Sequence, residues 1–198
     1  MAQTQNDKYI MLTIVGGFII AFVVNTLSVL IYPPDMSGEF PVYDNDGIMM
    51  VQFSGAFLLI ALTVVAMKAE EEKQILAAAG FTAQAISFGI GFLSIFDIAG
   101  IVSFEQYEEY YRITVSSNFL YFPSLLLIAS YGRFKVWVRV VSTLAGIPFL
   151  VSSLMFIIGI RDYYLLESVT NVGVALVSLT WLLWSYNIYI NYKTDLLK

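Results

Sequence analysis

The chain has 198 residues, of which 59% are hydrophobic and 13% are charged, with a formal net charge of −5. Soluble domains carry roughly 25% charged residues, so this composition excludes an ordinary globular protein. The sequence contains no cysteine and no histidine. This excludes disulfides, Cys/His zinc sites, His-ligated haem and the Ser-His and Cys-His catalytic arrangements.

Long apolar segments follow one another along the chain and predict an all-α fold, a polytopic integral membrane protein with a bundle of six transmembrane helices. The predicted spans are residues 9–32, 48–67, 74–104, 114–131, 136–160 and 168–192. Each approaches or exceeds the ~20 residues that cross a hydrocarbon core of ~30 Å. Because the loops between them are short, residues 1–198 are expected to form a single transmembrane domain. The first span outruns a signal-peptide core, so we expect no cleavage there.

The distribution of lysine and arginine predicts the orientation of this bundle. With six spans, both termini share one side of the membrane, and most of the basic residues fall on that side: Lys8, Lys68, Lys73, Arg133, Lys135, Arg139, Lys193 and Lys198. The positive-inside rule therefore predicts that the N- and C-termini are cytoplasmic. The loops on the outer side are acidic, with Arg112 and Arg161 as their basic residues.

Asp97 lies inside the third span, where an ionisable side chain is a hypothesis of function by default. Only seven residues separate it from the outer end of that span, which places it roughly 10 Å below the outer boundary. Two interpretations remain open. Asp97 has a structural hydrogen-bonding or helix-end role, or it handles a cation, a proton or a substrate.

Every predicted span carries hydrogen-bonding side chains in its outer half. With Gln84 from the inner half of the third span, they form a candidate polar vestibule, whose main residues are Asp97, Asn25, Gln52, Gln84, Ser94, Asn118 and Asn171. In one interpretation this vestibule opens to the outside, beneath acidic loops that attract cations. In the other, these side chains join neighbouring helices, each hydrogen bond contributing ~0.6 kcal/mol on average.

Small residues recur on one side of the third span and predict a helix-packing face. Gly80, Ala83, Ser87 and Gly91 fall at spacings of three and four residues. Residues at this spacing share one side of a helix, and small side chains there allow a second backbone to approach closely. We therefore expect the third span to lie at the centre of the bundle, with Asp97 at the edge of the same face.

Two surface segments carry further predictions. In residues 104–112, Glu105, Glu108, Glu109 and Arg112 follow helical spacing, which predicts a helical turn lying along the outer interface. In residues 131–139, Arg133, Lys135 and Arg139 alternate with aromatic residues at the cytoplasmic surface. These three cations are candidates for contact with anionic lipid, although their part in setting the topology also explains them.

The sequence favours a non-catalytic protein, because it shows no catalytic constellation, phosphate-binding loop or dinucleotide fingerprint. Our leading hypothesis is an accessory subunit or oligomeric scaffold of a membrane complex, acting through helix packing. Its expected partners are the lipid bilayer and other membrane subunits or further copies of itself; no nucleic acid, cofactor or metal is expected. The alternative is a small transporter or channel for a cation or small solute, entered from the acidic outer face, with Asp97 as its key group.

Overall fold

The computed structural model describes the backbone of residues 5–35, 37, 40–98 and 104–196, and the side chains of residues 7–35, 37, 40–90 and 105–195. The helices are α1 (Gln5–Ile31), α2 (Asn45–Glu71), α3 (Ile75–Ile98), α4 (Phe104–Ile128), α5 (Val136–Ala145), α6 (Ile147–Ile157) and α7 (Tyr163–Leu196). Within these described ranges the only extended pairing is an isolated bridge between Asp35 and Val42, so the all-α prediction is confirmed.

Four stretches of helix in the described residues are long and apolar enough to cross a membrane. They are Asp7–Ile31, Asn45–Glu71, Val136–Ile157, which combines α5 and α6, and Tyr163–Asp195. A shorter apolar stretch, Ile75–Ile90, lies in α3. α4 is as long as the spanning helices, but its first turns carry several charged residues. The helical architecture and several helices able to span a membrane are thus shown, and four of the six predicted spans meet this criterion of length and hydropathy.

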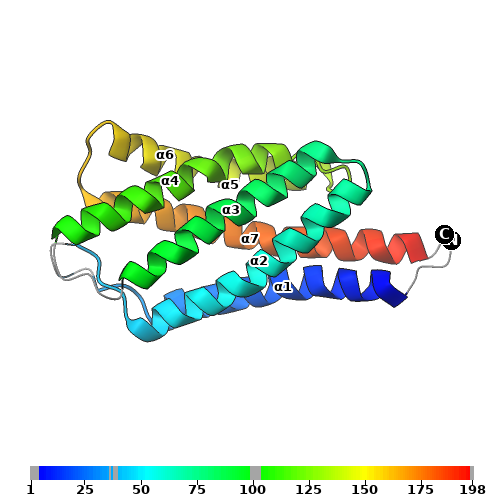
Figure 1. Cartoon of the computed structure of the whole chain (residues 1–198), viewed down its shortest axis with the longest axis horizontal. Helices are drawn as coiled ribbons and strands as arrows, with labels where there is room; N and C mark the ends of the chain where they lie inside the picture. Colours follow the sequence, from blue (N-terminus) through cyan, green and yellow to red (C-terminus); the bar gives the residue numbers. More distant parts are fainter. Residues whose placement is uncertain (1–4, 36, 38–39, 99–103, 197–198) are drawn as a thin grey trace.

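The helices alternate in direction along the long axis of the molecule, as Figure 1 shows, and both termini lie at the same end. We call this the terminal end, and the opposite end the far end. Consecutive helices pack against each other, and α7 returns to pack against α1, so the helices close into a ring in the order α1, α2, α3, α4, α5–α6, α7. Short connections at alternating ends produce this neighbour-to-neighbour arrangement.

The predicted fifth span is broken into α5 and α6 at Gly146. Pro148 lies in the first turn of α6, where its missing N–H removes one helical hydrogen bond and its ring disfavours continuous helix. A Cβ atom at residue 146 would lie 2.9 Å from Leu125 Cδ1 and 3.2 Å from Phe122 Cα, so α4 approaches the break closely. The break therefore lies where only a glycine fits against α4 without adjustment.

An aromatic cluster fills the ring of helices toward the terminal end. It consists of Phe18, Phe81, Tyr131, Phe134 and Trp184, all of them buried. The Trp184 ring lies 5.5 Å from Phe18, 5.7 Å from Phe81 and 5.9 Å from Phe134, measured between centroids. Because α3 and α7 are not neighbours in the ring, the contact between Phe81 and Trp184 crosses its centre.

Candidate functional site

Polar side chains join most neighbouring helices of the ring. Ser54 on α2 donates a hydrogen bond of 2.8 Å to the Ala21 carbonyl oxygen on α1. The Asn25 amide on α1 donates to Ser178 Oγ on α7 at 3.0 Å. On the other side of α7, Trp184 Nε1 donates to Ser142 Oγ on α5 at 2.8 Å. In an apolar environment such bonds satisfy groups that would otherwise be left without a partner.

α3 and α4 are joined by the densest set of these contacts. Ser87 Oγ donates to the Ser117 carbonyl oxygen, and Ser117 Oγ donates to the Ser87 carbonyl oxygen, each at 2.7 Å. Nearer the terminal end, Ser124 Oγ on α4 donates to Gln84 Oε1 on α3. Because each of the two serine hydroxyls bonds the backbone of the facing helix, the pair fixes how α3 and α4 are aligned along their axes.

The predicted helix-packing face contributes to this same junction. Gly80 is buried, and a Cβ atom there would lie 2.6 Å from the Ile128 amide nitrogen and 2.8 Å from Leu127 Cβ. Ser87 makes the reciprocal bond to α4, while Ala83 is half-buried. The surroundings of Gly91 lie outside the described residues. Small residues at positions 80 and 87 thus face α4 at backbone contact distance.

The described residues of the predicted vestibule occupy different environments. Asn25 and Gln84 are buried and each bonds a serine on a neighbouring helix. Asn118 is buried, and its amide nitrogen makes no hydrogen bond among the described residues. Gln52 is half-buried and Asn171 is exposed.

The hydrogen bonds of Asn25 and Gln84 each go to a serine outside the predicted vestibule. The described side chains of the vestibule thus make no hydrogen bond to one another. The two remaining members, Asp97 and Ser94, are on α3, and their side chains lie outside the described residues. Asn25 and Gln84 therefore take part in helix-to-helix contacts.

Near the far end, a buried carboxylate lies among tyrosines that the sequence analysis did not group together. Glu167 on α7 is only 5% exposed, and Tyr107 on α4 donates to its Oε1 at 2.9 Å. The Tyr43 side chain, from the loop that precedes α2, also lies close to Glu167. A buried carboxylate needs such donors, since an unsatisfied one is costly. Glu167 thus joins α4, α7 and the loop at this end.

Stacked aromatic rings surround this carboxylate. Tyr107 stacks on Phe40 at 5.0 Å and meets the edge of Tyr163 at 5.2 Å, between ring centroids. Desolvation and the nearby charge of Glu167 raise the pKa of the Tyr43 hydroxyl well above its usual range. Tyr43 therefore keeps its proton at neutral pH. We name Glu167, Tyr43, Tyr107, Tyr110, Tyr111 and Tyr163 the tyrosine–glutamate cluster.

The terminal end carries a network of ion pairs. Arg133, in the loop before α5, pairs with Glu72 at 2.7 Å and with Asp195 near the end of α7 at 3.0 Å. Desolvation lowers the pKa of Arg133, but the hydrogen bonds and charge of these two acids raise it by more, above its usual range. The network borders a cleft of about 160 Å³ that α1, α2 and α7 also line. It thus connects the ends of α2 and α7 to the α4–α5 loop.

The three cations predicted to contact anionic lipid differ in the hydrogen bonds and ion pairs that they make within the protein. Arg133 is held by Glu72 and Asp195. Arg139 donates to the carbonyl oxygens of Phe134 and Gly132, at 2.7 and 3.1 Å. The Lys135 side chain is exposed. Lys135 is accordingly the member of this set with the most accessible charge.

Comparisons with protein-family models, with curated proteins and with solved structures find no match. Among the described residues, no group of three or more acidic side chains is placed to hold a metal ion. Functional inference therefore rests on the geometry of the bundle: the helix-to-helix hydrogen bonds, the aromatic cluster, the tyrosine–glutamate cluster and the ion-pair network.

Proposed function

We propose that this chain is a non-catalytic integral membrane protein that acts through helix packing, as an accessory subunit or oligomeric scaffold of a membrane complex. The observation that carries this proposal is how the bundle uses its polar groups. Asn25, Gln84 and Ser87 hydrogen-bond neighbouring helices. Toward the terminal end, aromatic rings around Trp184 fill the centre of the ring of helices.

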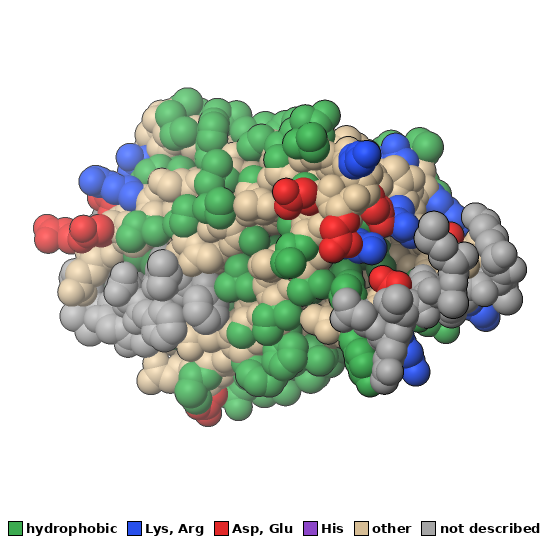
Figure 2. Space-filling view, turned by 45° about the vertical axis from the view of Figure 1, so that its right-hand side comes forward, with side chains coloured by type: hydrophobic (Ala, Val, Ile, Leu, Met, Phe, Trp, Pro, Cys, Tyr) green, Lys and Arg blue, Asp and Glu red, His purple; other side chains and the backbone are tan. Residues whose placement is uncertain are grey.

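The proposal includes a bundle of six transmembrane helices, with α3 and α4 crossing the membrane beside the four strongly apolar stretches. Apolar side chains cover a broad surface between charged groups gathered toward the two ends, as Figure 2 shows, which suits a bilayer around the middle of the bundle. We place the terminal end in the cytoplasm, because Lys68 near the end of α2, Arg133 in the α4–α5 loop and Arg139 in α5 lie toward that end. The acidic loops of the far end then face outward.

Extraction from native membranes in a mild detergent tests the proposed function. The tagged chain should migrate with another polypeptide, or with further copies of itself, at a fixed stoichiometry. Purified chain in proteoliposomes should give no solute or cation flux above that of empty vesicles. A chain that always migrates alone, together with flux in the vesicles, would overturn the proposal.

One observation favours a second candidate, a small transporter or channel for a cation or small solute. Glu167 is a buried carboxylate near the far end, and Tyr43 of the connecting loop lies close to it. In this alternative Glu167 and Asp97 would be the groups that meet a cation entering from the acidic side. Flux in proteoliposomes that disappears in Glu167→Gln and Asp97→Asn, but survives in the exposed control Glu105→Gln, would establish this candidate in place of the first.

A further inference from the structure

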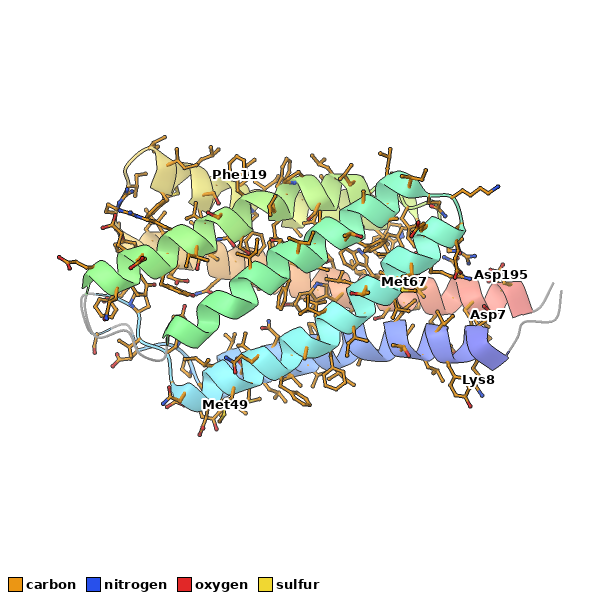
Figure 3. The ribbon with its side chains drawn as sticks, in the orientation of Figure 1. Asp7, Lys8, Met49, Met67, Phe119 and Asp195 are labelled. Atoms are coloured by element: carbon orange, nitrogen blue, oxygen red, sulfur yellow. The ribbon has the colours of Figure 1, made fainter. Side chains whose placement is uncertain are left out.

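A groove runs along the outside of the bundle between α2 and α3. It encloses about 390 Å³ and is lined by Thr63, Ala66, Met67 and Glu70 of α2 and by Ala78, Thr82, Ala85 and Ile86 of α3. On each helix these residues follow spacings of three and four, so each set forms one stripe. Met67, at the rim, is labelled in Figure 3. The groove is about two helical turns long, since seven to eight residues rise about 11–12 Å.

Two of the residues that line this groove carry hydroxyl groups that make no hydrogen bond among the described residues. Thr63 and Thr82 are both exposed, and neither makes a side-chain hydrogen bond among the described residues. Elsewhere in the bundle, Thr114 and Thr143 return their hydroxyls to the carbonyl four residues earlier. Thr63 lies eight residues from the end of α2 and Thr82 seven from the start of α3, so both lie roughly 10–12 Å from the terminal end. The two hydroxyls thus have the same depth on facing helices.

The junction between α2 and α3 also differs from the others in the ring. α1–α2, α3–α4, α5–α7 and α7–α1 are each joined by side-chain hydrogen bonds within the helices. Between the described residues of α2 and α3, the side-chain bond joins Gln74 to Glu72 in the turn that connects them. In the described part of this junction, the two helices thus lack a side-chain hydrogen bond to each other within their helical segments.

Charge at the cytoplasmic end of the groove indicates which kind of side chain a docked helix would place there. Three consecutive glutamates end α2: Glu71 pairs with Lys68 at 3.1 Å, and Glu72 pairs with Arg133 at 2.7 Å. Glu70, which lines the groove, is exposed and makes no ion pair among the described residues. Transmembrane helices carry an excess of Lys and Arg at their cytoplasmic ends. A helix in the groove would place such a cation beside Glu70.

We infer that this groove docks one transmembrane helix of a different polypeptide, with small or hydroxyl-bearing residues against Thr63 and Thr82 and a Lys or Arg beside Glu70. The inference rests on the proposed function and names the surface that it uses. A second copy does not fit the groove by symmetric pairing, because two concave surfaces leave the space between them empty. Pairing of the groove with another face of a second copy would be heterologous, giving a ring or an open filament, and the test below distinguishes it from a different polypeptide. Lipid tails offer no hydrogen bond to the threonines, and lipid phosphate is repelled by Glu70.

Photocrosslinking in native membranes tests the docking site. A photoreactive amino acid is placed at Thr63 or at Thr82, and at Phe119 as a control. Phe119 is 45% exposed on α4, well away from the groove in Figure 3. We expect a polypeptide adduct from both groove positions and none from residue 119. Mass spectrometry should place the attached segment in an apolar helix with Lys or Arg at its cytoplasmic flank.

Two matched variants examine the chemistry of the site. With the photoreactive residue at position 63, Thr82→Leu fills the groove and should lower the adduct yield about tenfold, the effect of losing one hydrogen bond and its packing. Thr13→Leu replaces an exposed threonine on α1 and should leave the yield unchanged. Glu70→Lys should lower the yield in the same way as Thr82→Leu, because it sets two cations against each other.

The outcomes separate this inference from the proposed function. An adduct of lipid alone, an adduct of a second copy, or equal yields from Thr82→Leu and Thr13→Leu would each overturn the docking site. If the chain nevertheless migrates with another polypeptide after detergent extraction, the proposed function stands and only the groove assignment fails. If the chain migrates alone and no polypeptide adduct forms, both fail.

Discussion

Replacing Gly80 by alanine perturbs a close contact between α3 and α4. A Cβ atom at residue 80 would lie 2.6 Å from the Ile128 amide nitrogen, 2.8 Å from Leu127 Cβ and 2.9 Å from the Ser124 carbonyl oxygen. Two of these atoms belong to the α4 backbone, so no side-chain rotation relieves the clash. α3 and α4 must move apart, which also stretches the reciprocal bonds between Ser87 and Ser117.

Gly89 provides a matched control on the same helix, because a Cβ atom there meets nothing within 4 Å. Both substitutions gain the higher helix propensity of alanine, up to ~1 kcal/mol. Only Gly80→Ala adds overpacking, which costs about 1–3 kcal/mol. The difference in unfolding free energy between the two variants isolates the close contact, and we expect Gly80→Ala to be less stable than Gly89→Ala by about 1–3 kcal/mol.

Reversible unfolding in mixed micelles of rising dodecyl sulfate content, followed by tryptophan fluorescence, measures both free energies. The three tryptophans of the chain report the packing of the bundle directly. Equal stability of the two variants, or a more stable Gly80→Ala, would refute the contact between α3 and α4 on which this reasoning depends. Wild-type protein in the same titration sets the reference for both.

Three further predictions use the same unfolding assay. Ser87→Ala and Ser117→Ala should each cost about 0.6–1.7 kcal/mol, because each removes the donor of one bond to a carbonyl oxygen of the facing helix; a variant as stable as wild type would contradict this. Trp184→Ala should cost about 3–5 kcal/mol by opening a cavity in the aromatic cluster, while Trp184→Phe should cost far less. Arg133→Ala should cost about 0–2 kcal/mol, for two partly exposed ion pairs, and the loss should shrink in high salt; a salt-independent loss would indicate packing instead.

The fold class could be predicted from the sequence because apolar length and helix formation are properties of each segment alone. The segment boundaries were harder to predict. Residues 104–112 were predicted as a helical turn along the interface, and the structure continues them into α4 without a break. Spacings of three and four residues show that a segment is helical. They do not show whether that helix ends before the next apolar segment, because no proline or glycine separates the two.

Glu167 was missed for a related reason. The last span was predicted to begin at residue 168, which assigned Glu167 to an outer loop. α7 begins at Tyr163, where the Asp162 carboxylate accepts a hydrogen bond from the Leu165 amide at 3.0 Å. An aspartate in this position is a helix-start signal that the sequence contains. With the start at residue 163, Glu167 lies in the second turn of the helix and reaches Tyr107 on α4.

The candidate vestibule shows why depth in the membrane is not enough to predict a site. Orientation and span length place polar residues of different helices at similar depths, and depth is all that a single sequence supplies. Whether two of them meet depends on the direction in which each side chain points around its helix axis. Asn25 points toward α7, Gln84 toward α4, and Asn171 is exposed. Polar residues assigned to one vestibule thus divide into separate helix-to-helix bonds, whereas Thr63 and Thr82 line one groove at a similar depth and make no side-chain hydrogen bond among the described residues. An outside helix is expected at the junction between α2 and α3 for that reason.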